Sequence, residues 1–169
     1  GICATLIGSY LAYLFDGRYD GALDFHIIQS KNGFEPFIDN GINIVTTFLF
    51  IFLAAKIINT KTRIIDAFTS VLIARIPLYL LPFTNFNHAL STDIDPTDLN
   101  AMMVYLNNHI VAVVIISILS ILAVVWFIAL LWNGYKTASN AKGTKAILLF
   151  ITALLLAEIT SKICIHYLN

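Results

Sequence analysis

Long apolar stretches alternate with short polar segments along the chain of 169 residues. A transmembrane helix needs roughly 20 consecutive, mostly apolar residues, and four of the stretches approach this length while a shorter one opens the chain. The first stretch is too short to cross alone, so we expect a truncated span, the outer part of a helix that begins before Gly1. The pattern predicts an all-α polytopic membrane helical bundle with five transmembrane helices in a single domain, residues 1–169. The predicted spans cover residues 1–15, 41–58, 64–83, 109–132 and 146–165.

The composition supports the membrane assignment and removes one class of partner. Apolar residues make up 59% of the chain and charged residues 12%, whereas soluble domains average about 45–50% and about 25%. Ten basic and ten acidic residues cancel, so nothing indicates a nucleic-acid partner. We expect a multi-pass integral membrane protein whose main partner is the lipid bilayer. The cysteines, Cys3 and Cys164, match no metal or redox spacing, and we expect them to stay unbridged.

Basic residues in the links between spans predict the orientation in the membrane, because loops rich in Lys and Arg stay in the cytoplasm. Two links hold six such residues, whereas the other loops hold only Arg18 and Lys31. The N-terminus is therefore expected inside and the C-terminus outside. The six basic residues are Lys56, Lys61, Arg63, Lys136, Lys142 and Lys145.

Three polar segments separate the predicted spans. Residues 16–40 are too polar to cross a membrane, and residues 133–145 are typical of a glycine-containing turn. Residues 95–98, Asp-Pro-Thr-Asp, are typical of a helix start, with Asp at the N-cap and Pro in the first turn. We expect that helix either to continue through Tyr105 into the fourth span or to break near residues 107–108.

Two charged residues lie deep inside predicted spans, and we expect them to form an ion pair. Arg75 is twelve residues after Arg63 and Glu158 thirteen after Lys145, which places both about 18–20 Å from the inner surface. A guanidinium in hydrocarbon is costly and needs a partner inside the protein. The pair can form a transport site or fix the register of the helices. The sequence has no third deep charge, which favours the structural role.

Two further charges accompany this pair. Lys162 is four residues after Glu158, on the same face of the helix, and can compete for its carboxylate. Asp66 is nine residues before Arg75 and therefore on the opposite side of its helix. We expect Asp66 to meet Lys61, Arg63 or water near the inner surface.

No motif in the sequence predicts a catalytic or metal centre. Asp93, Asp95 and Asp98 lack the Gly and the closing Glu of an EF-hand loop and are better explained as a capping turn. Nucleophile–base pairs, phosphate loops and paired membrane aspartates are missing from the sequence as well. We therefore expect a protein that is not an enzyme and has no cofactor. None of the histidines has a second ligand three or four residues away; they are His26, His88, His109 and His166.

Two short patches give the sequence a resemblance to a known family. In residues 61–82 a basic turn leads into an amphipathic helix opening and a late proline. In residues 132–149 a tryptophan ends a span before Gly-Tyr, small residues and a lysine. With five spans, these features resemble the Yip family of Ypt/Rab-interacting membrane proteins, in the form of its prokaryotic relatives.

The resemblance implies a role in vesicle trafficking or membrane shape, with prenylated small GTPases as partners of the eukaryotic members. Family members are expected to meet partners through a cytosolic N-terminal region. No part of this sequence corresponds to that region, so no functional residue is carried over.

The sequence leaves two functions open. The first is a scaffold or adaptor of the Yip type, which meets protein partners through its cytoplasmic side. The second is a small transporter or channel, a homo-oligomer in the membrane, with Arg75 and Glu158 on its path. A hydrated cavity around these two residues would favour the transporter, and a dry, packed pair would favour the scaffold.

Overall fold

The computed structural model describes residues 1–28, 32–88 and 99–168, and these are predominantly helical. A single small hairpin of strands β1 (Gly17–Arg18) and β2 (His26–Ile27) interrupts the helices within this described part. The helical elements are α1 (Ile2–Leu14), α2 (Glu35–Ile58), α3 (Ile64–Ala74), the 3₁₀ helix η1 (Ile76–Asn85), α4 (Leu99–Ser139) and α5 (Gly143–Leu168).

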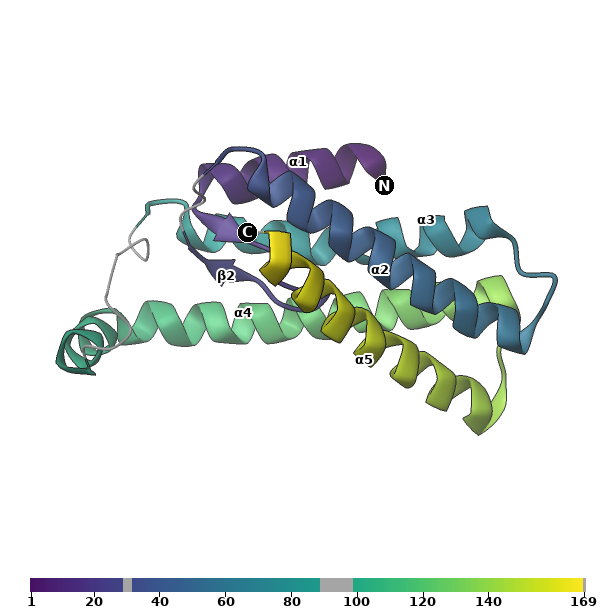
Figure 1. Cartoon of the computed structure of the whole chain (residues 1–169). Helices are drawn as coiled ribbons and strands as arrows, with labels where there is room; N and C mark the ends of the chain where they lie inside the picture. The colour runs from purple at the N-terminus through teal and green to yellow at the C-terminus, as the bar shows by residue number, and fades with distance from the viewer. Residues whose placement is uncertain (29–31, 89–98, 169) are drawn as a thin grey trace.

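The long helices run along one direction, with their links gathered at opposite ends of the bundle (Figure 1). The links 59–63 and 140–142 lie at one end, which we call the basic end because it carries the six Lys and Arg residues of the two basic links. The β-hairpin and the C-terminal end of α5 lie at the other, which we call the hairpin end. α2 packs along α5, and α3 packs along α4.

Four segments are long and apolar enough to cross a membrane: Glu35–Ile58, Ile64–Asn85, Asn107–Ser139 and Gly143–Leu168. Their mean hydropathy lies between 1.7 and 3.1. α1 is equally apolar in character but has only 13 residues. The prediction of an all-α bundle with membrane-length helices is therefore confirmed, whereas five spans and their orientation stay predictions.

The third segment changes helix type in its middle because of proline. Pro77 has no N–H to donate to the carbonyl of Ile73, one α-turn earlier, so the α-helix cannot continue past it. α3 ends at Ala74, and the ten residues of η1 follow as a 3₁₀ helix, far longer than the usual three or four residues. Arg75 lies at this junction, as the C-cap of α3 and the N-cap of η1.

α2 begins earlier than the hydropathy pattern predicts. The polar character of residues 16–40 predicted a start at Gly41, but the helix starts at Glu35, with Pro36 in its first turn. Asp39, Asn40 and Asn43 are fully buried on this helix. These polar residues can lie in a buried part of the helix because other protein groups, and not water, form their hydrogen bonds.

The turn predicted over residues 133–145 is much shorter in the structure, because residues 133–139 belong to α4 and residues 143–145 belong to α5. α4 continues to Ser139, and the link comprises only residues 140–142, with Asn140 in the left-handed conformation at φ 51°. Tyr135 and Ser139 are buried, so this stretch packs against the protein and does not turn. Residues 107–108 lie inside α4, so the helix continues past them, while residues 95–98 lie outside the described part of the chain.

Gly134 is a packing glycine, and replacing it tests this assignment. A Cβ at this position would lie 2.5 Å from Ser70 Cβ, so Gly134→Ala would force α4 away from α3. We expect a loss of about 1–3 kcal/mol in the free energy of unfolding, the usual cost of overpacking. Denaturation in detergent measures it.

Gly41→Ala is the matched control, because a Cβ there meets nothing within 4 Å in the interior of α2. It is expected to be neutral or to stabilise by up to about 1 kcal/mol, since alanine is the better helix former. Equal effects of the two substitutions would contradict the close approach of α3 and α4 at Gly134.

Two smaller predictions have clear outcomes. Cys3 and Cys164 are both free, which confirms that they do not form a disulfide. The side chain of Asp66 is exposed and, among the described residues, forms no ion pair. Of the predicted alternatives for Asp66, the ion pairs with Lys61 and Arg63 are therefore not formed.

Candidate functional site

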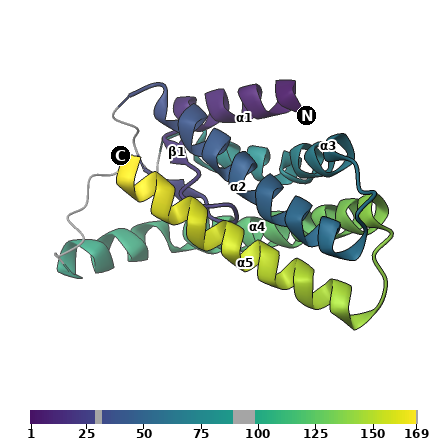
Figure 2. The ribbon, with the colours of Figure 1, turned by 45° about the vertical axis from the view of Figure 1, so that its right-hand side comes forward.

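The β-hairpin between α1 and α2 extends into the helical bundle. Its strands pair antiparallel, with Gly17 opposite Ile27 and Arg18 opposite His26. Figures 1 and 2 show it entering between α4 on one side and α2 with α5 on the other. Two short strands give the hairpin little stability of its own, so the surrounding helices must hold it.

Side chains from three helices bind the backbone at the hairpin tip. Asn43 Nδ2 donates to the Tyr19 carbonyl at 2.8 Å, and the Ala22 N–H donates to Ser161 Oγ at 3.1 Å. Arg75 Nη1 donates to the Ala22 carbonyl at 3.1 Å. The Leu23 N–H donates to Glu158 Oε2 at 2.8 Å. Buried backbone groups need such partners, and here helix side chains provide them.

Arg75 and Glu158 meet across one peptide group and not directly. The Ala22 carbonyl and the Leu23 N–H belong to the same peptide unit, so its negative end faces the guanidinium and its positive end faces the carboxylate. The prediction that both charges reach the same place is confirmed by their shared partner. The predicted ion pair between Arg75 and Glu158 is wrong, because the tip of the hairpin occupies the space between them.

Arg75 is fully buried and belongs to a polar cluster on α2 and the hairpin. Its Nε donates to Asn40 Oδ1 at 3.1 Å, and its Cζ lies 5.8 Å from the centroid of the Tyr19 ring. The Tyr19 hydroxyl in turn donates to the Gly8 carbonyl of α1 at 3.3 Å. The guanidinium therefore links α3, α2 and the hairpin, and through Tyr19 also α1.

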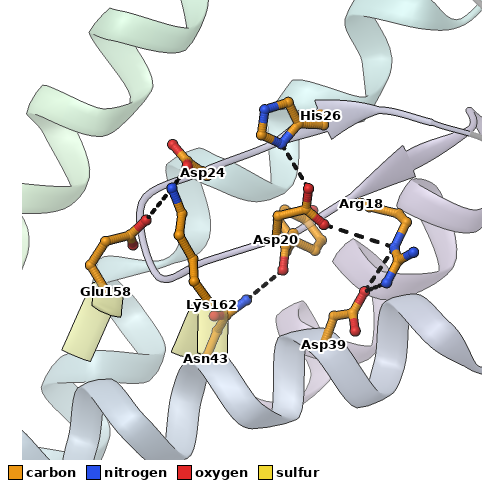
Figure 3. Close-up of polar contacts among 9 residues, drawn as sticks. Arg18, Asp20, Asp24, His26, Asp39, Asn43, Glu158 and Lys162 are labelled. Atoms are coloured by element: carbon orange, nitrogen blue, oxygen red, sulfur yellow. Dashed lines mark hydrogen bonds and ion pairs between the residues drawn. The ribbon is translucent and has the colours of Figure 1, made fainter. Parts of the chain in front are cut away.

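Glu158 has a second partner, as its spacing predicted. Lys162 Nζ lies 3.2 Å from Glu158 Oε1 and also forms an ion pair with Asp24 of the hairpin. Gly21 permits this arrangement, because a Cβ there would lie 2.6 Å from Glu158 Oε1. Figure 3 shows Asp24, Lys162 and Glu158 in a row along one side of the hairpin.

A second set of charges holds the hairpin near its base. Arg18 donates from Nε and Nη2 to Asp39 Oδ2, at 3.0 and 2.8 Å, and its Nη1 lies 3.7 Å from Glu35 Oε2. His26 Nδ1 lies 3.0 Å from Asp20 Oδ2. Their hydrogen bond lowers the pKa of Asp20 and raises that of His26, which outweighs the opposing effect of partial burial.

An open polar cavity of about 450 Å³ lies between the hairpin and the last turns of α5. Arg18, Asp20 and His26 line it from the hairpin, and Lys162, Ile165 and His166 line it from α5. We call this cavity the polar pocket. It lies beside the ion pairs that hold the hairpin, so the same side chains both fasten the hairpin and form the cavity walls.

Sequence reasoning found Arg75, Glu158 and Lys162 but missed the hairpin and its other partners. Arg18, Asp39, Asn43 and Ser161 were overlooked, because each has the appearance of an ordinary loop or helix residue. One signal was present. Asp39, Asn40, Asn43 and Thr47 recur at the spacing of one helix face, which predicts a polar surface that must meet something polar.

Comparison of the chain with models of known families, with curated proteins and with solved structures found no match. The resemblance to the Yip family therefore rests on the residues themselves, residues 61–82 and 132–149.

Proposed function

We propose that this protein is a non-enzymatic, multi-pass integral membrane protein that acts as a scaffold or adaptor of the Yip type. One observation carries the proposal: the two deep charges, Arg75 and Glu158, both bind the Ala22–Leu23 peptide unit of the hairpin. Their hydrogen bonds are used to hold structure. A transport site would instead leave at least one of them free to bind a substrate or to transfer a proton.

The depth of the hairpin explains why charges are needed there. Glu158 lies ten residues before the end of α5, about 15 Å along the helix, and Arg75 lies ten residues before the end of η1, about 20 Å. In a bilayer with a hydrocarbon core of about 30 Å, this places the tip near the middle. Non-helical backbone is tolerated at such depth only when the protein satisfies its polar groups.

The basic end supports a cytoplasmic surface for protein partners. Lys61 and Lys142 are exposed in the two links at this end, and positive charge favours the cytoplasmic side. A scaffold that is fixed in the membrane by its hairpin would present these links to partners, which the Yip resemblance suggests are small GTPases or other trafficking proteins.

A specific observation favours a second candidate, an oligomeric transporter or channel. Arg75 Nη2, Asn43 Oδ1 and Thr47 Oγ1 are buried and have no hydrogen-bond partner within the described part of the chain. Unsatisfied polar groups are costly inside a protein and are concentrated at working sites. Proton movement along this face of α2, past Arg75 and Glu158, is the alternative that an experiment must exclude.

Reconstitution into liposomes distinguishes the two functions. A pH-sensitive dye and an ion-selective dye inside the vesicles should report no flux above that of empty liposomes if the charges are structural. A photo-cross-linker at Lys142 should capture a discrete protein partner in cells, whereas one at the lipid-facing Ile151 should not.

Glu158→Gln separates the outcomes further, because it keeps an oxygen for the Leu23 N–H but removes the charge. Flux that this variant abolishes without unfolding would establish the transporter and overturn the scaffold.

The orientation gives a further prediction. A reporter fused after Asn169 should indicate the outside, and one inserted in the link 140–142 should indicate the cytoplasm. The six basic residues at the basic end are the physical reason. Two reporters on the same side of the membrane would contradict the five-span topology, and reversed signals would contradict the orientation alone.

A further inference from the structure

The polar pocket has hydrogen-bond donors that nothing in the described chain uses. His26 uses Nδ1 for Asp20, which leaves Nε2, and Lys162 uses its ammonium for Asp24 and Glu158, which leaves a third N–H. His166 is exposed and forms no hydrogen bond to any described residue. The lining of the pocket therefore presents three basic side chains with free donor capacity, and Arg18 adds a positively charged guanidinium.

Acceptors are scarce in the same cavity. Asp20 is the one carboxylate among the described lining residues, and both His26 and Arg18 already lie against it. A metal ion would need several acidic or imidazole ligands together, and no group of three or more His, Cys, Asp and Glu suited to a metal occurs in the described ranges. Free donors without free acceptors are the chemistry of an anion site.

The total charge around the pocket links anion binding to the histidines. Arg18, Lys162 and Arg75 provide the fixed positive charges of the cluster. Its five carboxylates exceed these by two; they are Asp20, Asp24, Glu35, Asp39 and Glu158. Protonation of His26 reduces this excess, so an anion is attracted better when His26 is charged, and the hydrogen bond that His26 donates to Asp20 raises the pKa of His26.

A groove on the other face of the hairpin shares His26 with the polar pocket. It has a volume of about 410 Å³ and lies between β2 and α4. Its lining on α4 runs from Tyr105 to Ser120, about 22 Å at 1.5 Å per residue, which exceeds the roughly 15 Å of one leaflet's hydrocarbon. Phe25, Ile27 and Ile116 make much of it apolar. A molecule with a charged head and a hydrocarbon tail can therefore occupy both hollows at once.

We propose that the polar pocket binds a phosphate group through Lys162, His26 and His166, and that this phosphate belongs to an anionic phospholipid whose acyl chain lies in the groove along α4. The hairpin end is where the head groups of one leaflet lie if the four long helices span the bilayer. The proposal is independent of whether the protein is a scaffold or a transporter.

Binding of dihexanoyl phosphatidylglycerol to the purified protein in detergent, followed by native mass spectrometry, tests the site. Dihexanoyl phosphatidylcholine and inorganic phosphate are the comparison probes. His166→Gln should weaken the binding of phosphatidylglycerol by about tenfold, the effect of one charge-assisted hydrogen bond, without altering the unfolding transition. Lys145→Gln, at the basic end, is the matched control and should have no effect.

Two further measurements identify the source of the phosphate and the charge coupling. Ile116→Trp fills the groove and should weaken the lipid but not inorganic phosphate. Affinity should fall as the pH rises from about 6 to about 8, because His26 loses its proton as the pH passes its pKa, which the hydrogen bond that it donates to Asp20 raises.

Each possible result decides one part of the proposal. If inorganic phosphate binds as tightly as the lipid and Ile116→Trp has no effect, the phosphate site stands and the lipid assignment falls. If phosphatidylcholine binds equally well, or if His166→Gln and Lys162→Gln both leave binding unchanged, the anion site is overturned. Stabilisation by a divalent cation in place of phosphate would overturn it as well.

Discussion

Replacing Arg75 with leucine is expected to lower the free energy of unfolding by about 3–5 kcal/mol, the range for removing one partner from a buried ionic arrangement. The guanidinium is fully buried and donates to the Ala22 carbonyl and to Asn40 Oδ1. Leucine leaves both acceptors inside the bundle without this donor, and each orphaned group adds to the cost. Ile73→Leu, on the exposed face of the same helix, is the control and should change little.

The double variant with Glu158→Leu distinguishes the bridged arrangement from a direct ion pair. Two charges in direct contact can be replaced together by apolar residues with little loss. Here the Ala22–Leu23 peptide unit loses its donor and its acceptor, so the double variant should be at least as unstable as either single variant. Recovery of most of the stability in the double variant would contradict the bridging peptide.

Unfolding of all four proteins in detergent measures these energies, and hydrogen exchange adds a local readout. The Leu23 N–H should be protected in the wild-type protein, because it donates to Glu158 Oε2. It should exchange faster in the Glu158→Leu variant. Slow exchange in that variant would mean that the hairpin tip does not depend on the carboxylate.

The sequence predicted where the deep charges lie but not what they bind. Arg75 and Glu158 reach one level because each is a fixed number of residues from a basic link, and helix rise converts that count into depth. Their common partner is a backbone peptide unit, which has no residue type of its own. No pattern of side chains could therefore distinguish a bridged pair from a direct one.

The hairpin was missed for a related reason. Residues 16–28 have the Gly, Asp and aromatic content of a solvated loop, and an inserted loop has the same composition when helix side chains satisfy its backbone. Those side chains lie far away in the sequence: Ser161 is 139 residues from Ala22, and Glu158 is 135 from Leu23. Local patterns contain no information about contacts at such separations.

The turn predicted at the end of α4 was wrong there because glycine occurs both in turns and where two helices pack closely. Asn133-Gly134 is a common turn signal, yet Gly134 is a helix residue that allows α3 and α4 to approach. The residue that turns the chain is Asn140, six positions later. Only the burial of Tyr135 and Ser139, a property of the packed structure, distinguishes these uses.

The base of the hairpin contains a direct ion pair between Arg18 and Asp39. We therefore expect a double substitution at this pair to recover stability, unlike the double substitution of Arg75 and Glu158. Arg18 places two N–H groups on Asp39 Oδ2, and the Asp39 side chain is fully buried. Arg18→Leu removes the cation that neutralises this carboxylate and is expected to cost about 3–5 kcal/mol of unfolding free energy. Arg63→Leu, an exposed arginine at the basic end, is the matched control and should cost about 0–1 kcal/mol.

Adding Asp39→Asn to Arg18→Leu should recover a substantial part of this loss, because a neutral amide no longer needs a cation. The recovery should be incomplete, since Glu35 also lies 3.7 Å from Arg18 and keeps its charge. Denaturant unfolding of the single and double variants measures the coupling between positions 18 and 39. Strictly additive losses would mean that the pair does not hold the hairpin. Recovery of stability in the Arg18/Asp39 double variant would show that contacts between side chains hold the base of the hairpin. No recovery in the Arg75/Glu158 double variant would show that side chains hold the tip through its backbone.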